Sequence, residues 1–433
     1  MAKRLNATDP GFLADFSALL SAKRESDVDV NQTVTDIIND VRTRGDEAVI
    51  EYTKRFDRLD VTAQTLAIGA EEISKGREAV DAGTMAALKT AATRIEDFHV
   101  RQLPDYEDYV DGAGVRLGYR WTPVQAAGLY VPGGTAAYPS SVLMNAIPAR
   151  VAGVKRLVMV VPTPDGIINP LVLAAAEIAG VSEIYRIGGA QAVAALAYGT
   201  PSIKPVDKIV GPGNAYVASA KRQVFGTVGI DMIAGPSEIL VVADGSNNAN
   251  WIACDLLSQA EHDTAAQSIL ITDDAVFADA VEAAVEAELK TMPRSEIAGQ
   301  SWRDFGVIIV VENLLDAVAL IDQIAPEHLE LAIEDPDELF EKINNAGAVF
   351  LGRYTPEAIG DYVAGPNHVL PTARSARFSS GLGVLDFMKR TTFIGCDAGS
   401  LNEIGGAAVK LADAEGLIAH GRSISVRLNK AKE

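Results

Sequence analysis

A glutamine and a histidine stand three residues apart at the end of an apolar segment, in the stretch LLSQAEHDTAAQ. They are Gln259 and His262. On a helix, residues three positions apart lie on the same face with their Cβ atoms about 5–6 Å apart, so both side chains could reach one small ligand. The alternative is a helix that simply ends in polar residues. Evidence from the rest of the sequence is needed to choose between a ligand site and a simple helix end.

Histidines carry the strongest chemical signal in this sequence. The chain contains five, which are His99, His262, His328, His368 and His420. All but the first lie among polar or turn-forming residues, and Glu261, Glu327 and Glu415 stand shortly before three of them. Imidazole is the commonest metal ligand and exchanges its proton near neutral pH, so this set suits metal binding, acid–base chemistry or both. A lone histidine is more often a surface or capping residue, and we interpret His99 in that way.

A metal site can be assembled from these residues. Gln259 and His262 from one helical turn, a histidine from elsewhere and a carboxylate such as Asp361 in AIGDYVAGPNH offer mixed nitrogen and oxygen ligands. Such a set suits Zn²⁺ and also Mn²⁺ or Co²⁺. The spacing matches neither H-E-x-x-H nor paired C-x-x-C signatures. The residues alone therefore indicate metal-assisted chemistry on a small polar substrate and leave the reaction open.

The composition narrows the class of protein. The 433 residues include 38 Lys and Arg against 58 Asp and Glu, and the net charge of −20 repels nucleic acid and anionic membranes. No apolar run approaches the roughly 20 residues that span a bilayer. Two cysteines are too few for a disulfide framework, and the start MAKRLNATDP lacks the apolar core of a signal peptide. We expect a cytoplasmic protein that acts on a small molecule, with no nucleic-acid and no membrane partner.

Hydrophobic periodicity predicts the elements that position these residues. Helical spacing dominates the first part of the chain, as in NQTVTDIINDVRTRGDEAVIEYTKRF and TMAALKTAATRIEDFHVRQL. Short β-branched runs then alternate with alanine-rich helices, as in RLVMVVP with PLVLAAAEIAG and EILVVAD with NANWIACDLLSQA. This alternation is typical of βαβ units and parallel sheets. The tail reads as helical segments broken at Gly405-Gly406.

These patterns predict an α/β fold with two parallel-sheet domains, a helical N-terminal layer and a small helical C-terminal module. We expect the N-terminal helical region to span residues 1–120 and to pack on the α/β core. The two α/β domains are expected at 121–240 and 241–375. The helical tail is expected at 376–433.

Three glycine-rich turns follow predicted strands on the first α/β block. They are YVPGGT (130–135), RIGGAQA (186–192) and VGPGNAYV (210–217). None is the G-x-G-x-x-G fingerprint or a P-loop, and each alone is best read as a tight connection between strand and helix. Three in succession favour a ligand more strongly, because open parallel sheets bind ligands at the carboxyl ends of their strands.

Eight motifs, in their order and spacing, resemble the histidinol dehydrogenase family. They are GLYVPGGT, GGAQAVAALAYGT, VGPGNAYV, AGPSEILVVAD, DLLSQAEHD, PEHLEL, GDYVAGPNHVLPT and AEGLIAHGRS, and they cover essentially the whole chain. The resemblance implies two Rossmann-like domains with NAD on the first, one Zn²⁺ per subunit and an intertwined homodimer. It also implies that NAD is used twice, to oxidise L-histidinol through L-histidinal to L-histidine in the last steps of histidine biosynthesis.

The resemblance further implies roles for individual residues. Glu327 and His328 resemble the acid–base pair. The residues that would bind Zn²⁺ are Gln259, His262, Asp361 and His420. Contacts to the substrate would come from Ser237, Gln259, His262, His328, Asp361, His368, Glu415 and His420. The tail would bring His420 and Glu415 to the site of the partner subunit, and NAD would meet Tyr130, Gln191 and Asn214.

The chemistry explains these residue types. Zn²⁺ has no redox role but can orient histidinol, and His328 suits the base that removes the hydroxyl proton as hydride leaves. Glu327 would activate the water that must add to the aldehyde. Two other classes stay open, namely a zinc-dependent dehydrogenase of another alcohol and a metal hydrolase that forms no NADH. A non-catalytic metal-binding module fits least, because it would not need an acid–base pair.

Overall fold

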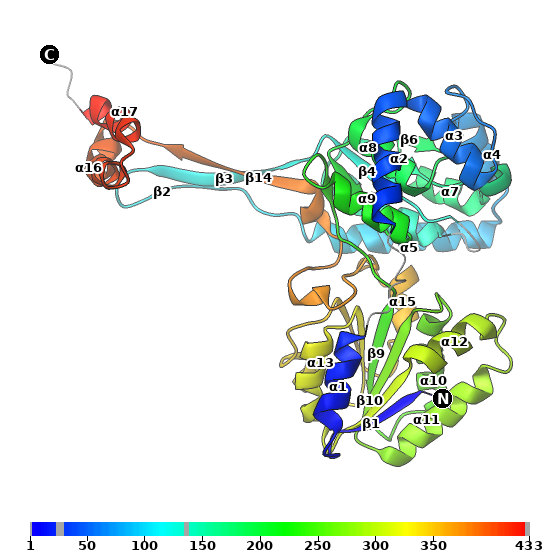
Figure 1. The fold of residues 1–433 in the computed structure, drawn as a ribbon. Coiled ribbons are helices and arrows are strands. Elements are labelled where there is room, and N and C mark those ends of the chain that lie inside the picture. Colours follow the sequence, from blue (N-terminus) through cyan, green and yellow to red (C-terminus); the bar gives the residue numbers. More distant parts are fainter. Residues whose placement is uncertain (1, 23–29, 134–137, 429–433) are drawn as a thin grey trace.

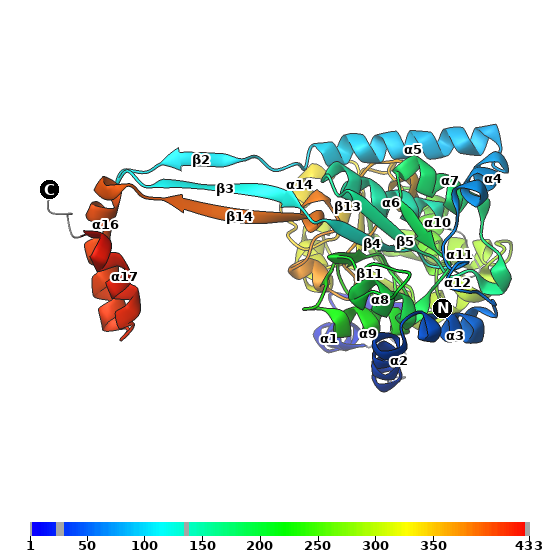
Figure 2. The same ribbon diagram turned by 90° about the horizontal axis from the view of Figure 1, so that it is seen from above.

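The computed structural model describes residues 2–22, 30–133 and 138–428. Within these ranges the strands form three sheets, of which two are parallel and one is antiparallel. Figures 1 and 2 show two globular α/β domains and a long, narrow arm that leaves the first domain and ends in a pair of helices. The predicted α/β fold class with two parallel-sheet domains agrees with this architecture.

The first domain is a five-stranded parallel sheet in the order β6-β5-β4-β7-β8. Its strands are β4 (Ala126–Tyr130), β5 (Arg156–Val160), β6 (Glu183–Tyr185), β7 (Lys208–Val210) and β8 (Gly229–Ile230). The helices between them are α6 (Pro139–Val151), α7 (Pro170–Ala179), α8 (Gly189–Tyr198) and α9 (Ala215–Val224). The central strands are almost continuously apolar because helices cover both faces of the sheet.

A layer of N-terminal helices packs on this domain, as the helical periodicity predicts. The layer consists of α2 (Asn31–Arg44), α3 (Asp46–Asp57), α4 (Ala70–Glu78) and α5 (Ala82–Val100). Helix α2 lies against α8, α4 against α7 and α5 against α6. The helical spacing in α2 buries one face, formed by Val34, Ile37, Ile38 and Val41.

The second domain is a six-stranded parallel sheet in the order β1-β11-β10-β9-β12-β13. Its strands are β1 (Lys3–Asn6), β9 (Glu238–Ala243), β10 (Gln267–Thr272), β11 (Val307–Val310), β12 (His328–Ala332) and β13 (Ala348–Leu351). Its α-helices are α1 (Phe12–Ser21), α10 (Ala249–Ala260), α11 (Ala275–Glu288), α12 (Ser295–Phe305), α13 (Ala317–Ile324), α14 (Asp337–Phe340) and α15 (Glu357–Tyr362). The N-terminus thus contributes an edge strand to this sheet, beside β11, although we expected a helical region there. Four residues are too few to show a periodicity.

Both domains repeat one strand order. With the added edge strand β1 left aside and the strands numbered from β4 and from β9, the orders β6-β5-β4-β7-β8 and β11-β10-β9-β12-β13 both read third, second, first, fourth, fifth. This is the order of the Rossmann fold, in which ligands bind beside the first strand at the carboxyl edge of the sheet. The repeat lies in the topology, and no short sequence period accompanies it.

The arm is an antiparallel ribbon in the order β14-β3-β2, capped by two helices. Its strands are β2 (Glu107–Val110), β3 (Arg116–Pro123) and β14 (Met388–Gly395), and its helices are α16 (Ala398–Ala414) and α17 (Ile418–Leu428). Strands β2 and β3 lie in the stretch expected to be helical. The ribbon was missed because its central strand β3 pairs with β14, more than 250 residues away. The guanidinium of Arg390 stacks over Tyr119 and Trp121, which stabilises an exposed ribbon that has no core of its own.

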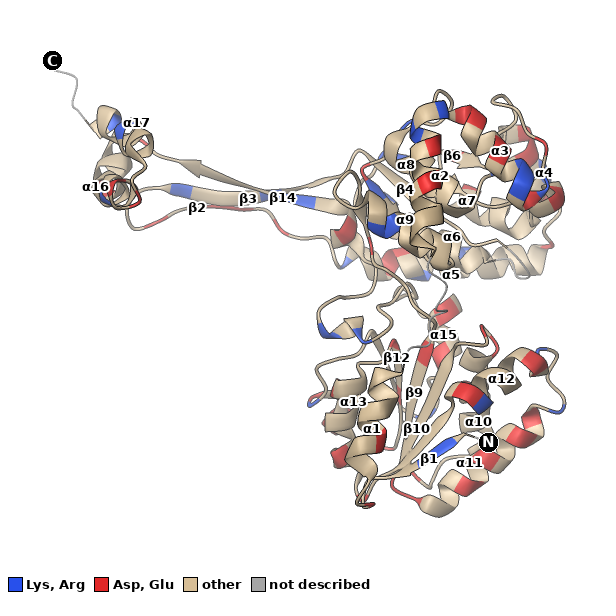
Figure 3. Ribbon diagram, in the orientation of Figure 1, with Lys and Arg blue, Asp and Glu red and all other residues tan. Residues whose placement is uncertain are grey.

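Charge is distributed unevenly over these parts. Figure 3 shows Asp and Glu on the outer helices of both domains, Lys and Arg on helices of the first domain, and further Lys and Arg along β3 and β14 of the arm. Among the described residues, no helix combines the length and the apolar character needed to cross a membrane.

The tail differs from the prediction at Gly405-Gly406. Helix α16 runs through both glycines without interruption, and the chain turns instead at Gly416, where φ is +72°. Gly405 is buried, and a Cβ atom there would lie 2.7 Å from Leu428 Cδ2 of α17. The predicted break is therefore wrong, because this glycine serves the close packing of two helices.

We expect Gly405→Val to loosen the helix pair, since overpacking typically destabilises by about 1–3 kcal/mol. Gly406→Val is the matched control, because a Cβ at Gly406 meets no atom within 4 Å. Hydrogen–deuterium exchange of the backbone amides in 398–428 measures the difference. Equal exchange in the two variants would contradict this packing role.

Candidate active site

The candidate site lies where the carboxyl edge of the first sheet faces the amino edge of the second. Figure 1 shows α15 at the end of the second domain that faces the first. Ser141 Oγ, at the start of α6 in the first domain, lies 3.3 Å from His368 Nε2, in the segment that follows α15. A cavity of about 450 Å³ opens here, and its walls come from the end of α5, the starts of β12 and β13, and α15. Both domains therefore contribute to one site.

His328 is the first residue of β12 and is buried at 4% exposure. Its Nδ1 lies 2.9 Å from the carbonyl oxygen of Glu238. A carbonyl can only accept, so Nδ1 carries the hydrogen and Nε2 keeps its lone pair. Within the described part of the chain Nε2 makes no hydrogen bond, although it lies 3.5 Å from Glu357 Oε1, and His328 lines the cavity. Burial lowers the pKa of His328, so the ring is neutral and ready to accept a proton.

Glu327 precedes His328 and is held by the same residue of β9. Its Oε2 accepts a hydrogen bond of 2.9 Å from the backbone N–H of Glu238 and lies 3.7 Å from His328 Nδ1. Burial raises the pKa of Glu327 well above its ordinary value. The parallel pairing of β9 with β12 thus fixes the two side chains through the N–H and the carbonyl of one residue.

Helix α15 places two carboxylates beside His328. Glu357 and Asp361 are four residues apart and so share a helix face. The candidate ligand atoms of His328, Glu357 and Asp361 all lie within 4.8 Å of one another. Burial, and then the charge of Asp361, raise the pKa of Glu357 to about 8. Burial acts to raise the pKa of Asp361 as well. The hydrogen bond and charge of His368, together with the charges of His328 and His262, outweigh burial and lower this pKa to about 2.

Gln259 and His262 lie at the end of α10, which packs against α15. Gln259 is buried at 1% exposure, and its Oε1 has no hydrogen-bond partner among the residues that the structure describes. His262 follows the helix end and is exposed, and its N–H donates to the Gln259 carbonyl at 3.1 Å. It is one of the histidines whose charge lowers the pKa of Asp361. The imidazole of His262 therefore lies near that carboxylate, and Gln259 lies one helical turn before His262, on the helix that packs against α15.

Ser237 directly precedes β9 and is partly buried. Its carbonyl accepts the N–H of Gln267 at 3.0 Å. It is the neighbour of Glu238, whose backbone holds the acid–base pair, so it stands beside the site.

The residues predicted to meet NAD lie at the carboxyl edge of the first sheet. Tyr130 ends β4, and its hydroxyl accepts the N–H of Gly189 at 3.0 Å. Burial raises the pKa of Tyr130 to about 12. Gln191, in the first turn of α8, is buried, and its Oε1 has no hydrogen-bond partner in the described ranges. Asn214 is the exposed N-cap of α9 and accepts the N–H groups of its first turn at 3.1 and 3.2 Å.

Glycines keep this edge free of side chains. A Cβ at Gly188 would lie 2.5 Å from Pro162, and one at Gly211 would lie 2.1 Å from the Tyr130 carbonyl oxygen. Gly134 and Thr135, in the first of the three predicted turns, lie outside the described residues.

Glu415 and His420 do not reach this site within one chain. They lie at the end of α16 and the start of α17, and both are exposed. Figures 1 and 2 place these helices at the far end of the arm from both domains.

Two residues of the site were missed in the sequence. Glu357 stands four positions before Asp361, and this helical spacing could have pointed to it. Glu238 opens the otherwise apolar strand EILVVA, and a charged residue in such a run is a signal as well. Its role depends on its backbone, which no residue type reveals.

Comparison with known proteins shows the family. The family model described as histidinol dehydrogenase matches residues 20–428. The chain belongs to the histidinol dehydrogenase family. It is 67% identical over 434 residues to the histidinol dehydrogenase of Rhodospirillum rubrum and 64% identical over 433 residues to that of Rhizobium meliloti, with 100% of each chain covered.

A solved structure shares the fold. The histidinol dehydrogenase of Elizabethkingia anophelis has a TM-score of 0.94 with this chain at 37% identity, over 99% of this chain and 98% of that one. The family resemblance, the α/β fold class and the assignment as an oxidoreductase are therefore confirmed.

Gln259→Leu tests whether the buried amide oxygen is a metal ligand. We expect Zn²⁺ affinity to fall at least about 10-fold, since even residues that only support a metal ligand contribute 10- to 100-fold. The thermal midpoint of the metal-free protein should not fall, because leucine fills the space and removes an unsatisfied polar atom. Gln191→Leu is the control, being equally buried but at the other sheet. A matching loss of Zn²⁺ affinity in the control would contradict the assignment.

Proposed function

We propose that this protein is a zinc- and NAD-dependent histidinol dehydrogenase. It oxidises L-histidinol through L-histidinal to L-histidine, a four-electron reaction that forms the last steps of histidine biosynthesis. Membership of the family supports histidinol as the substrate. The observation that carries the chemistry is the buried Nε2 of His328, a residue that lines the cavity: this nitrogen makes no hydrogen bond in the described chain.

The donor set fits Zn²⁺. Gln259 supplies a buried amide oxygen that lacks a partner among the described atoms, Asp361 is ionised at neutral pH, and His262 adds an imidazole. Tetrahedral zinc sites take such nitrogen and oxygen ligands. The cluster of His328, Glu357 and Asp361 is a competing site, but the raised pKa of Glu357 favours its protonated form. When bound, the ion would orient the imidazole and amine of histidinol in the site.

NAD fits the first domain better than the second. The carboxyl edge of the first sheet offers bare glycine backbone, Asn214, and the buried Gln191 Oε1, for which the described chain supplies no partner. The same edge of the second sheet is lined by Asp244, Asp273, Asp274 and Glu334. These carboxylates would repel a pyrophosphate. When bound at the first sheet, NAD would accept the hydride, and each oxidation would use one molecule.

His328 and Glu327 would share the proton transfers. Hydride leaves a carbinol carbon only as its hydroxyl proton leaves, so a base is needed in both oxidations. His328 Nε2 suits this role because the Glu238 carbonyl holds the hydrogen on Nδ1. Burial raises the pKa of Glu327 and so makes its carboxylate a stronger base, and we assign to it the activation of the water that adds to the aldehyde.

A homodimer would complete the site. Glu415 and His420 are exposed at the tip of the arm, and we propose that they reach the site of the partner subunit. Large exposed apolar side chains on the tip helices, among them Leu411, Leu417 and Ile418, support a contact there. The ranges 121–240 and 241–375 for the two α/β domains remain part of this proposal, whereas β1 and α1, within residues 1–120, belong to the second domain.

We also propose a cytoplasmic location without nucleic-acid or membrane partners. The net charge of −20 and two exposed cysteines without a disulfide support it.

The function is tested by product stoichiometry with L-histidinol. We expect two NADH for each L-histidine formed, measured by NADH absorbance and chromatography. A chelator should abolish turnover and leave the circular dichroism of the α/β fold intact, and Zn²⁺, Mn²⁺ or Co²⁺ should restore it. Turnover without NADH would favour a metal hydrolase, and no turnover of histidinol would favour another alcohol. Unfolding on metal removal would contradict a catalytic role for the ion.

Glu327→Gln separates the two oxidations. Only the second step requires water, so oxidation of histidinal should slow by about 10²–10⁴-fold, the usual effect of losing an acid–base group, while oxidation of histidinol is affected less. His328→Ala should slow both steps. Single-turnover NADH formation from histidinol and from histidinal provides the measurement. Equal losses in both steps for Glu327→Gln would overturn the division of roles.

Complementation tests the shared site. His262→Ala and His420→Ala chains should each be inactive alone. After subunit exchange, a heterodimer should regain one intact site, built from His262 of one chain and His420 of the other. No recovered activity despite demonstrated exchange would exclude the shared site.

A further inference from the structure

A buried ion pair lies beneath the turn 211–214 in the first domain. Lys221 of α9 pairs with Asp231, which follows β8, and their side chains are 3% and 1% exposed. Neither residue belongs to the sites described above. The pair lies at the carboxyl edge of the sheet, where β7 ends and the turn begins.

Both partners bind the backbone of one residue in that turn. The N–H of Gly211 donates to Asp231 Oδ2 at 2.8 Å, and Lys221 Nζ donates to the carbonyl oxygen of Gly211 at 2.9 Å. The backbone N–H of Asp231 in turn donates to the carbonyl of Ile209 in β7 at 3.2 Å. The ion pair therefore fixes both polar groups of Gly211 relative to the strand and the helix.

Gly211 has little freedom to adopt another conformation. Its φ is +109°, and it approaches β4 so closely that a Cβ would lie 2.1 Å from the Tyr130 carbonyl oxygen. Three residues later, Asn214 caps α9 through its side chain. The turn is thus held between Tyr130 and Asn214, two residues assigned to NAD.

Stability alone does not explain a pair of this kind. Burying two charges carries a large desolvation penalty, and replacing such a pair with apolar residues of similar volume is often neutral or stabilising. What an apolar pair cannot do is bind the N–H and the carbonyl of Gly211. The pair therefore contributes a defined backbone conformation.

We propose that Lys221 and Asp231 are positioning residues for the cofactor. They hold the turn 211–214 in the conformation that presents Asn214 and the bare glycine backbone to NAD. This inference rests on the proposed function, because it assumes that NAD binds at this edge.

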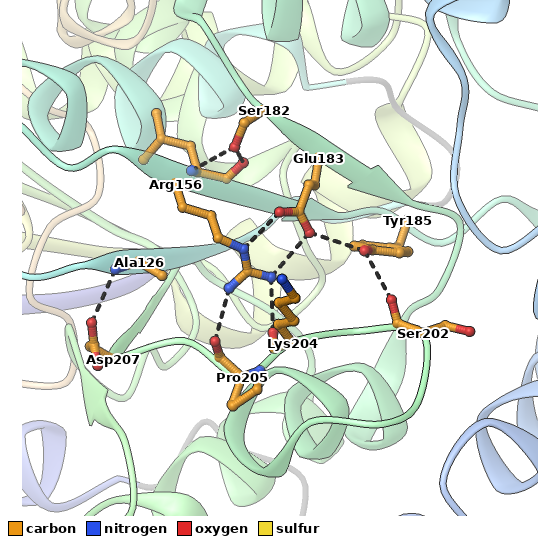
Figure 4. Close-up of polar contacts among 10 residues, drawn as sticks. Ala126, Arg156, Ser182, Glu183, Tyr185, Ser202, Lys204, Pro205 and Asp207 are labelled. Atoms are coloured by element: carbon orange, nitrogen blue, oxygen red, sulfur yellow. Dashed lines mark hydrogen bonds and ion pairs between the residues drawn. The ribbon is translucent and has the colours of Figure 1, made fainter.

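The same sheet offers a matched control at its opposite edge. Figure 4 shows Arg156, the first residue of β5, paired with Glu183, the first residue of β6, at 2.6 Å. Arg156 also donates to the carbonyl oxygens of Lys204 and Pro205, at 3.0 and 2.9 Å. This pair likewise braces a loop through its backbone, but at the amino edge, away from Tyr130.

The test compares Lys221→Met/Asp231→Leu with Arg156→Met/Glu183→Leu. For the first double variant we expect KM for NAD to rise about 10-fold or more, by analogy with the loss caused at metal sites when a residue that supports a ligand is removed. NADH affinity in titration calorimetry should fall in proportion, and the Gly211 amide should exchange faster without ligand. Its kcat and its KM for histidinol should change by less than about twofold. The control should keep the NAD affinity of the wild type.

Unchanged NAD affinity in the first double variant would overturn the inference, as would an equal loss in the control. If either double variant does not fold, Lys221→Gln and Asp231→Asn are measured in the same way, and wild-type NAD affinity in both would overturn it too. A wild-type protein that binds no NADH would instead refute the proposed function.

Discussion

The backbone of Glu238 holds the acid–base pair, and the rest of the site depends on this one interaction. Its N–H binds the carboxylate of Glu327, and its carbonyl fixes the hydrogen of His328 on Nδ1. Both hydrogen bonds require β9 and β12 to be neighbours in parallel register, which the strand order of the second domain ensures. The side chains of the pair are then oriented by secondary structure, and their pKa values follow from burial at the domain interface.

The site uses opposite edges of two sheets with the same topology. In the first domain the carboxyl edge faces the second domain, as the Rossmann strand order leads one to expect for a ligand site. In the second domain it is the amino edge that faces the first, while the carboxyl edge is acidic. The chain passes from β8 directly into β9, so the amino end of β9 begins near the first domain. The sheet edge proposed to bind NAD and the sheet edge that carries the acid–base pair are thereby brought together.

The sequence predicted the elements whose signal is local, and it missed those that depend on distant partners. The alternating strands and helices, the turn at Gly211 and the end of α10 at Gln259 all follow from periodicity or glycine content. Strand β1 and the arm could not be predicted in this way, because each is defined by pairing with residues far along the chain. Gly405 looked like a helix breaker because its packing partner in α17 could not be seen. For the site, the family motifs supplied the roles that residue types alone left open, and the contribution of Glu238 was invisible because it comes from the backbone.

The arrangement of donors around Asp361 is the central claim about the chemistry. Anomalous diffraction at the zinc edge, from crystals of the zinc-loaded protein, tests it most directly. We predict one peak per subunit, bounded by Gln259, His262 and Asp361 and by His420 of the partner subunit. A peak on the cluster of His328, Glu357 and Asp361 would contradict the account, because His328 would then be a ligand and could not serve as the base.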